Sequence, residues 1–453
     1  MRLLTCEAFD EGSLEADYLN LLLFDIGGGM RSVTLPQAYV SADVLRDGIG
    51  FDASNYGFAK VEQSDMVAVP DCNAAWLEER GGSAIAHVIC DVVSADRSDF
   101  DQYPRAVAKR AATYLREQGI ADSAQMLVEL EYYAFDTVEY GAGVDHAFYK
   151  VGSREGLGEA FSTRHRFAPL AGYHRLPPED RFFDFRNRTV SVMAQAGIPV
   201  KYHHHEVAAS QLEIELDFMD LARAADSVCI AKWIIRSIAQ EMGLAVTFMP
   251  KPLHKMPGSG MHVHQFLEKG GRSLFPGDAL YGLSREGLAY TAGLLEHSLS
   301  GSLLAFTNPS TNSFRRLVPG YEAPIGATFA RGSRNAAVRI PGYLKEDELR
   351  IEYRTGDGSA NVHYMLSAMV LAGVDGILRN ADPVALGFSG PEAREDKVFP
   401  LDLDVVLDGL ARDSAWLKPA FPNALLALWT ERKREEAAYV YHAPTPQEYE
   451  LYF

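Results

Sequence analysis

The chain has 453 residues, of which 47% are hydrophobic, and a formal net charge of −18 from 43 basic and 61 acidic side chains. This is the composition of an ordinary globular protein with one large or two smaller domains. The acidic balance argues against nucleic acid as the main partner, because phosphate backbones attract basic surfaces.

Neither a secretory leader nor a membrane span is expected. Acidic residues interrupt the N-terminus before an apolar stretch develops, and the longest apolar runs are far shorter than a membrane span. The cysteines form no CxxC pair, and their spacing indicates neither a zinc site nor a disulfide framework; they are Cys6, Cys72, Cys90 and Cys229. Reduced thiols in a cytoplasmic protein are therefore expected.

The first hundred residues are expected to form a small β-rich domain. Residues 18–35 read as two apolar runs on either side of Gly27-Gly28-Gly29, which is a hairpin signal. Residues 61–71, VEQSDMVAVPD, predict a strand followed by a turn.

Three strong helices are predicted further along the chain. Residues 104–119 begin with a proline suited to a first helical turn, carry apolar residues at helical spacing and end at Gly119. Residues 220–242 end at Gly243, and residues 360–378 form the third helix. Several strands lie between these helices, and they carry the chemistry.

Four segments alternate charged with apolar residues, so that the charged side chains share one face of a strand: VELEY (128–132), QLEIEL (211–216), MHVH (261–264) and LRIEYR (349–354). One such segment alone is usually an antiparallel strand with a solvated face. Solvated faces mix lysine, serine and threonine, whereas these faces hold only glutamate, histidine and arginine, together with one glutamine. The combination therefore favours a shared polar cavity.

Facing carboxylates repel one another unless cations neutralise them. Carboxylates with one or two imidazoles suit Mg²⁺ or Mn²⁺ better than zinc, and the arginines need an anion such as phosphate. Metal, arginine and phosphate together indicate phosphoryl transfer. The sequence has no GxxxxGK[ST] loop and no strand-linked GxGxxG, so a different architecture must hold ATP.

The run His203-His204-His205 is a weak candidate for a metal site of its own, because adjacent strand residues point to opposite faces. At most two of these imidazoles could reach one ion. Glu206, which follows them, is the better ligand candidate.

Residues 308–324, NPSTNSFRRLVPGYEAP, closely resemble the substrate loop of type I glutamine synthetases. Further blocks agree in order and spacing with this family, in the unadenylylated bacterial subtype: VTFMPKP (246–252), GSGMHVH (258–264), HHHEVAASQLEIEL (203–216), SRNAAVRIP (333–341) and LRIEYRTGD (349–357). The resemblance implies an α+β fold. A small β-grasp-like domain would span residues 1–105, and a catalytic domain would span residues 106–453, with an antiparallel sheet forming a half-barrel flanked by helices.

The resemblance also implies roles for individual residues. One metal would be held by Glu131, Glu206 and Glu213, and a second by Glu129, His262 and Glu352. Gly258, Arg316 and Arg354 would bind glutamate, while His264, Arg339 and Arg350 would lie along the ATP phosphates. Asp52, Glu322 and Arg334 would be catalytic: Asp52 binds ammonium, Glu322 closes the site and accepts a proton, and Arg334 steadies the phosphoryl group.

The implied reaction is ATP-dependent formation of glutamine from glutamate and ammonium through γ-glutamyl phosphate, with Mg²⁺ or Mn²⁺. Family enzymes are dodecamers of two hexameric rings with active sites between subunits, so Asp52 would serve a neighbour's site. A cytoplasmic homo-oligomer is expected, with neither nucleic acid nor membrane as a partner.

The chain departs from the family pattern beside the nucleotide and ammonium: Asn55, Lys201, Pro257, Phe266 and Asp347 replace more usual residues. These changes leave two alternatives open. One is a γ-glutamyl ligase for a larger amine, such as a polyamine, ethanolamine, methylamine or an aryl amine. The other is a catalytically weak regulatory paralogue. Retention of Asp52, Glu322 and every metal ligand favours ammonium and activity.

Overall fold

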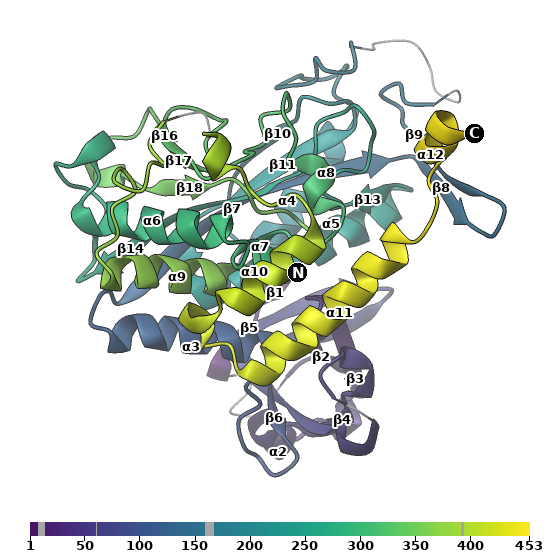
Figure 1. The fold of residues 1–453 in the computed structure, drawn as a ribbon. Helices are drawn as coiled ribbons and strands as arrows, with labels where there is room; N and C mark the ends of the chain where they lie inside the picture. The colour runs from purple at the N-terminus through teal and green to yellow at the C-terminus, as the bar shows by residue number, and fades with distance from the viewer. Residues whose placement is uncertain (8–13, 60, 159–166, 391–393) are drawn as a thin grey trace.

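The computed structural model describes residues 1–7, 14–59, 61–158, 167–390 and 394–453. Figure 1 shows a smaller N-terminal sheet below a larger sheet, with helices packed between and around them. The mixed organisation confirms the predicted α+β class.

The N-terminal sheet has the strand order β1-β5-β6-β2-β3, and β4 pairs with β5 at the side. All neighbouring pairs are antiparallel except β2 and β6, which are parallel. The bounds of its strands are β1 Arg2–Leu3, β2 Tyr18–Phe24, β3 Met30–Pro36, β4 Ile49–Asp52, β5 Asp65–Arg80 and β6 Ser83–Ser94, and the short helix α2 covers Ala42–Asp47.

The predicted hairpin is confirmed as β2 and β3. Asp25 closes the turn through its amide, which donates to the carbonyl of Gly29 at 2.9 Å, while Gly28 has a φ of 82°. A Cβ on Gly28 would come within 2.8 Å of the Asn361 backbone, so both the conformation and the close approach require glycine.

The predicted turn after residue 71 is wrong, because β5 continues to Arg80. The pairing of β5 with β6 shifts register between Pro70 and Ala75, so this segment is a bulge in one long strand and not a chain reversal. Asp71, inside the bulge, accepts a hydrogen bond from Arg105 at 2.8 Å, which holds the irregular backbone in place.

The expectation of reduced thiols is also wrong for one pair. Cys6 and Cys72 form a disulfide across 66 positions of sequence, whereas Cys90 and Cys229 are free and buried. Cys72 lies in the β5 bulge, and Cys6 lies just after β1. The two therefore meet through the pairing of β1 with β5, which the sequence spacing did not reveal.

The larger sheet has the strand order β10-β11-β7-β14-β18-β17-β16, with β12 and β13 on β7 and β15 on β14. It is antiparallel apart from the parallel pair β16 and β17. Its strands are β7 Ser123–Phe135, β10 Val200–His205, β11 Gln211–Leu216, β12 Met219–Asp220, β13 Ala245–Thr247, β14 Met261–Lys269, β15 Arg272–Ser273, β16 Phe329–Arg331, β17 Val338–Ile340 and β18 Ile351–Tyr353. The strands β8 Thr137–Ala142 and β9 Ala147–Gly152 form a separate hairpin.

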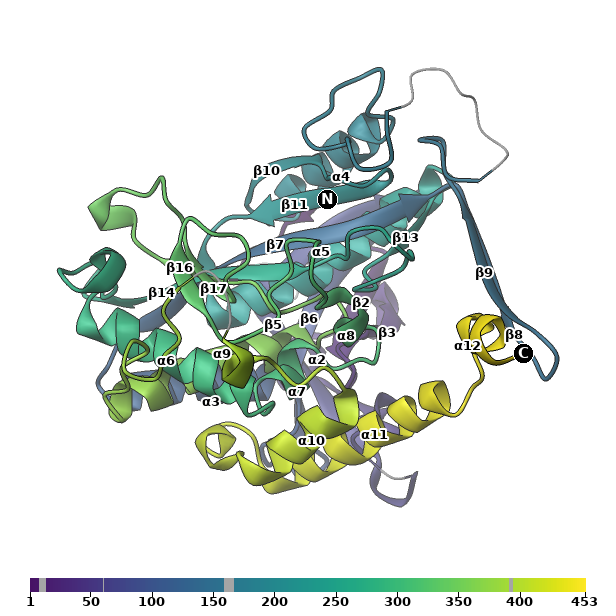
Figure 2. The same cartoon turned by 45° about the horizontal axis from the view of Figure 1, so that its top comes forward.

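The three predicted helices are confirmed as α3 Pro104–Glu117, α5 Leu221–Glu241 and α9 Val362–Leu378. They pack against one another, and α3 and α5 also contact β7, so one continuous apolar core lies beneath the larger sheet. The other helices are α4 Phe183–Gln195, α6 Arg285–Leu299, α7 Leu304–Thr307, α8 Ser313–Arg316, α10 Leu403–Arg412, α11 Asn423–Tyr441 and α12 Pro446–Tyr452. In Figures 1 and 2, α12 lies beside the β8–β9 hairpin.

The predicted domain boundary at residue 105 falls in the first turn of α3, which packs against α5 and α9 of the larger part. That boundary stays a prediction. Among the described residues, no helix combines the length and the apolar character needed to cross a membrane.

Candidate active site

A cavity of about 480 Å³ opens over the middle of the larger sheet. The predicted site residues that line it are Glu129, Glu131, Glu206, Glu213, Gly258, His262, Arg316, Glu322, Arg334, Arg339, Glu352 and Arg354. His264, Arg350 and Asp52 do not line it. The four segments that alternate charged and apolar residues therefore converge, as the sequence predicted.

Strand register brings the acidic side chains together. Glu213 of β11 is opposite Glu131 of β7, and Glu215 is opposite Glu129. On the other side of β7, His262 of β14 is opposite Glu129. Cross-strand neighbours point to the same face, so these residues form a patch over the strand centres.

Carboxylates crowd one end of the cavity. Burial, followed by repulsion from Glu131, raises the pKa of Glu206 to about 7. Burial together with the charges of Glu129, Glu206 and Glu131 raises the pKa of Glu213 well above its usual value. Such a cluster gains stability from any cation that neutralises it, so its donor chemistry fits a divalent metal.

His204 also lines this end of the cavity, although no separate role was predicted for it. Its Nδ1 is 3.6 Å from Glu206 and its Nε2 is 3.6 Å from Glu213. Burial lowers the pKa of this imidazole to about 4, which keeps it neutral and available as a ligand. Alternation along β10 could have revealed it, because His204 is two residues from Glu206 and pairs with Glu213.

Two imidazoles clasp Glu129 at the other end. His262 Nδ1 is 2.8 Å from one oxygen of Glu129, and His264 Nε2 is 2.8 Å from the other. Burial alone would raise the pKa of Glu129, but these contacts lower it well below its usual value. His262 Nδ1 also lies 3.7 Å from Glu131 and 3.9 Å from Glu352.

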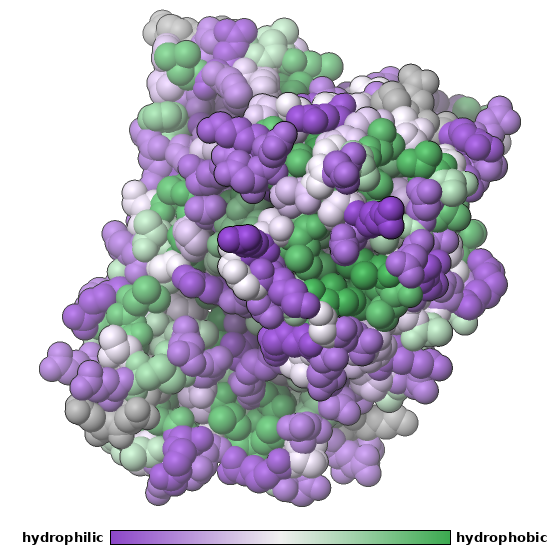
Figure 3. Space-filling model, turned by 90° about the vertical axis from the view of Figure 1, so that its left-hand side faces the viewer, coloured by the Kyte–Doolittle hydropathy of each residue, from purple (hydrophilic) through white to green (hydrophobic). Residues whose placement is uncertain are grey.

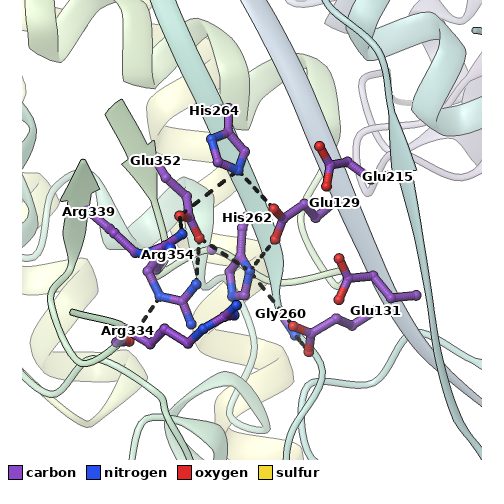
Figure 4. A network of polar contacts seen from close by, with 12 residues as sticks. Glu129, Glu131, Glu215, Gly260, His262, His264, Arg334, Arg339, Glu352 and Arg354 are labelled. Carbon is purple, nitrogen blue, oxygen red and sulfur yellow. Dashed lines mark hydrogen bonds and ion pairs between the residues drawn. The ribbon is translucent and has the colours of Figure 1, made fainter. Parts of the chain in front are cut away.

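Glu352 receives two guanidinium groups, as Figure 4 shows. Arg339 and Arg354 each approach one of its oxygens at 2.5 Å. Burial opposes ionisation, yet Arg354 and then His264 lower the pKa of Glu352 to about 2. The arginines come from the β16–β18 side and face Glu131 and Glu215 across the site.

Arg316 is fixed within the wall of the cavity. It is only 3% exposed and donates to the Thr355 carbonyl at 2.8 Å, while its Nη2 lies 3.1 Å from His262 Nε2. A Cβ on Gly258 would come within 2.6 Å of the Arg316 side chain, and a Cβ on Gly260 within 2.4 Å. These glycines leave the guanidinium room to face the cavity.

Arg354 also holds the rim of the cavity, where Glu322 and Arg334 lie. Its Nε donates to the Arg334 carbonyl at 3.0 Å, and its Nη2 donates to the Glu322 carbonyl at 3.3 Å. Glu322 has a φ of 57°, which is unusual for a residue with a side chain. One buried guanidinium thus connects the acid Glu352 with two loops that reach over the cavity.

His264 and Arg350 lie behind the lining residues. Arg350 Nε is 3.3 Å from His264 Nδ1, and its guanidinium lies 5.6 Å from the centre of the Phe218 ring. Phe266, one of the departures from the family pattern, meets the same Phe218 ring edge-on at 5.1 Å.

Asp52 lies at the end of β4 in the N-terminal sheet, exposed and outside the cavity lining. It accepts hydrogen bonds from the amide of Ser54 at 2.8 Å and from its hydroxyl at 2.9 Å. Hydrogen bonds from Ser54 and Ser64 lower its pKa, so the carboxylate stays charged.

The other departures are readily placed. Lys201 lies 2.6 Å from the buried Glu215, and the carbonyl of Pro257 accepts a hydrogen bond from the Tyr133 hydroxyl at 2.7 Å. Asn55 and Asp347 are exposed.

Within the described ranges, three groups of potential metal ligands meet at this site: His204 with Glu206 and Glu213, Glu129 with His264 and Glu352, and Glu129 with Glu213 and Glu215. In each group the ligand atoms lie within 4.8 Å of one another. A further group, Glu155 with Asp180 and His205, is fully buried beside the cavity.

Comparison with known proteins agrees with this geometry. Residues 15–95 match the model of the glutamine synthetase β-grasp domain, and residues 101–452 match that of the glutamine synthetase catalytic domain. The glutamine synthetase of Aquifex aeolicus is 36% identical over 452 residues, covering 96% of both chains. That of Escherichia coli K12 is 35% identical over 456 residues, covering 97% of both.

Solved structures show the same fold. Plasmodium falciparum glutamine synthetase, determined by cryo-electron microscopy, aligns over 100% of both chains with a TM-score of 0.92 and 25% identity. The apo structure of GmaS aligns over 96% of both chains with a TM-score of 0.80 and 25% identity. The N-terminal β-grasp domain is thereby confirmed, and the chain belongs to the glutamine synthetase family.

Proposed function

We propose that this cavity carries out the reaction of the family, ATP-dependent formation of glutamine from glutamate and ammonium through γ-glutamyl phosphate. The observation that carries the proposal is the facing arrangement in Figure 4, in which arginines oppose a buried cluster of carboxylates and imidazoles across one cavity. This arrangement provides separate places for cations and for phosphate or carboxylate anions.

We assign one divalent cation to Glu131, Glu206 and Glu213, with His204 adjacent, and a second to Glu129, His262 and Glu352. The raised pKa values of Glu206 and Glu213 support a cation at the first site. Glu352 is held by two arginines, so it becomes available to a cation when one of them turns to an anionic substrate. Bound Mg²⁺ or Mn²⁺ would supply charge neutralisation for the transferring phosphoryl group.

Each arginine of the site would bind a different anionic group of the substrates. Arg316 would bind the α-carboxylate of glutamate beside Gly258, and Arg354 would meet its side-chain carboxylate. Arg339, Arg350 and His264 would follow the phosphates of ATP, and Arg334 would face the transferring group. Arg316 is already held by the Thr355 carbonyl before substrate arrives, which lowers the cost of reorganisation at this donor.

Ammonium needs negative charge near the acyl phosphate. Glu322 on the rim supplies one carboxylate, and Asp52 would supply the other from a neighbouring subunit, since it does not line the cavity of its own chain. A ring assembly brings such surfaces together, so we propose a cytoplasmic dodecamer of two hexameric rings. We also propose that the N-terminal domain that carries Asp52 ends near residue 105.

The test measures phosphate release from ATP with glutamate, Mg²⁺ or Mn²⁺, and either ammonium or a panel of methylamine, ethanolamine and putrescine. Turnover with ammonium, with glutamine identified as the product by mass spectrometry, is expected. Turnover with a larger amine but not with ammonium would establish a different γ-glutamyl ligase. Failure with every amine would indicate a non-catalytic paralogue.

A further inference from the structure

Residues 1–7 form a short strap along the edge of the N-terminal sheet. Its strand β1 pairs with β5, with Arg2 opposite Leu77 and Leu3 opposite Trp76. The Leu4 amide continues the pairing by donating to the Ala75 carbonyl at 3.1 Å. After Leu4, the disulfide between Cys6 and Cys72 attaches the strap to the sheet.

The strap also reaches the catalytic part of the chain. A Cβ built on Gly197 would meet the Leu3 side chain at 2.6 Å, so the two are in close contact. The N-terminal ammonium donates to the Gln195 side chain at 2.9 Å. Residues 195–197 end α4 and lead into β10, the strand whose Tyr202 and His204 line the cavity.

The other end of the disulfide rests on a buried charge network. Asp71, next to Cys72, accepts a hydrogen bond from Arg105 at 2.8 Å. Arg105 is 4% exposed and also binds Asp91 and Asp226, each at 2.9 Å. Asp226 lies on α5, so the bulge that contains Cys72 is anchored to the core. The disulfide therefore joins the strap to a point that is anchored in the core.

The cysteines of the disulfide and the two free cysteines differ in access to solvent. Cys6 and Cys72 are half-buried, whereas Cys90 and Cys229 are 0% and 5% exposed. Burial raises the pKa of the Cys229 thiol to about 12 and raises that of Cys90 as well. Thiol–disulfide exchange requires an accessible thiolate, so only the first pair can exchange readily.

We propose that Cys6 and Cys72 form a reversible, redox-sensitive clamp. It fastens the N-terminal strap to the edge of the N-terminal sheet, where the strap also contacts the turn between α4 and β10. The clamp closes by exchange with a low-molecular-weight disulfide: two protein thiols give one protein disulfide and two small thiols. Two electrons pass from the cysteines to the small disulfide, and excess small thiol reverses the step.

The clamp acts on stability, since no residue of the strap lines the cavity. Opening it removes a covalent constraint on the unfolded chain, and it leaves the strap attached to β5 by backbone pairing alone. Reduction should lower the midpoint of thermal unfolding by roughly 3 °C and speed heat inactivation. Turnover at room temperature should change less than about twofold.

The test uses the full chain after treatment with oxidised or reduced glutathione. In the folded, reduced protein, iodoacetamide should label Cys6 and Cys72 but spare Cys90 and Cys229. Peptide mapping after oxidation should recover the Cys6–Cys72 link. The melting midpoint should respond to glutathione in the wild type, whereas the variants Cys6→Ser and Cys72→Ser should melt like the reduced wild type under both conditions.

Recovery of no linked peptide after oxidation would overturn the proposal, and so would equal melting midpoints for oxidised and reduced wild type. Because the decisive comparison uses one sequence in two redox states, it holds even where a serine variant fails to fold. The readouts do not depend on the amine substrate, so failure of the clamp and failure of the proposed activity are distinguishable.

Discussion

At the scale of single residues, Glu131 lies between the two proposed metal sites. It accepts a hydrogen bond from the Gly260 amide at 2.7 Å, lies 3.7 Å from His262 Nδ1 and contributes to the raised pKa of Glu206. Glu131→Gln should reduce metal-dependent turnover at least about 100-fold, because a proposed ligand and one of the site's charges are lost. Calorimetry with Mn²⁺ should show weaker binding.

A matched control for this variant is Glu117→Gln, which removes the same charge from the exposed end of α3, away from the cavity. Near-wild-type turnover of Glu131→Gln would remove Glu131 from the ligand set. The fold should be retained in both variants, since the amide of glutamine preserves the shape of the side chain and its acceptor oxygen.

His297 poses a separate question, because it lies outside the cavity and between two carboxylates. Its ring nitrogens are each 2.8 Å from an oxygen, one of Asp375 and the other of Asp413. Burial lowers the pKa of His297, but the two aspartates more than compensate and raise it overall. The imidazolium therefore ties α6 to α9 and to the end of α10.

A raised folded-state pKa has a defined consequence for stability. The contribution of His297 is complete below its unfolded pKa of about 6.5 and is lost as pH rises through the folded value. His297→Gln should destabilise by about 1–3 kcal/mol near pH 6, and the difference from wild type should shrink toward pH 9. Thermal unfolding of both proteins between pH 6 and pH 9 measures this difference in stability. A difference that does not change with pH would contradict a charged His297.

At the scale of elements, Lys201 and Glu215 join the ends of β10 and β11. Lys201 is the extra residue of an irregularity between Val200 and Tyr202, which lets its ammonium reach Glu215 at 2.6 Å. Glu215 is 1% exposed, so Lys201→Met would leave a buried carboxylate without its cation. We expect a loss of about 1–3 kcal/mol, with part recovered when Glu215→Gln is added.

A double-mutant cycle from denaturant unfolding measures this coupling. Strictly additive losses would show that the pair contributes no interaction energy. Activity assays on the same variants would show whether Lys201, a departure from the family pattern, affects the apparent KM for ATP.

The strands of the larger sheet show which site residues could be predicted from sequence. Strict alternation revealed Glu129, Glu131, His262 and Glu352, because a strand with one polar face has a period of two. His204 was considered only as part of the three-histidine run that ends β10, and its spacing of two residues from Glu206 was not used to place it on the same face. Patterns within one segment also could not reveal the Cys6–Cys72 link or the contacts of Arg105, which depend on pairing between distant segments.

At the scale of the whole molecule, several apolar surfaces favour assembly. The β8–β9 hairpin exposes the directly opposed pair Tyr140 and Tyr149 by 81% and 56%, and the C-terminal segment exposes Tyr452 by 82%. The hairpin and α12 lie together at one corner (Figure 2), and hydrophobic side chains also gather on a different face, on the opposite side of the molecule, which Figure 3 shows. Exposed apolar patches of this kind mark protein interfaces. Tyr140→Ser combined with Tyr149→Ser should therefore reduce the assembly size measured by light scattering; an unchanged mass would exclude this face of the hairpin from the interface.

An assembly in rings would divide each active site between two chains, and this can be tested by complementation. Asp52→Ala removes the carboxylate that a chain lends, whereas Glu131→Ala damages the cavity that it keeps. Each variant alone should be nearly inactive, because every site lacks one component. In mixed assemblies, a site is intact where the cavity of an Asp52→Ala chain meets Asp52 of a Glu131→Ala chain.

Random mixing of equal amounts makes about one quarter of the sites intact, since each of the two components is supplied correctly half of the time. Co-expression with two affinity tags and sequential purification isolates the mixed assemblies, and phosphate release measures their activity. Mixed assemblies of two wild-type chains with the same tags provide the reference. Activity no higher than that of the separate variants would show that no site combines Asp52 of one chain with Glu131 of another, because sharing between subunits requires that intact sites appear upon mixing.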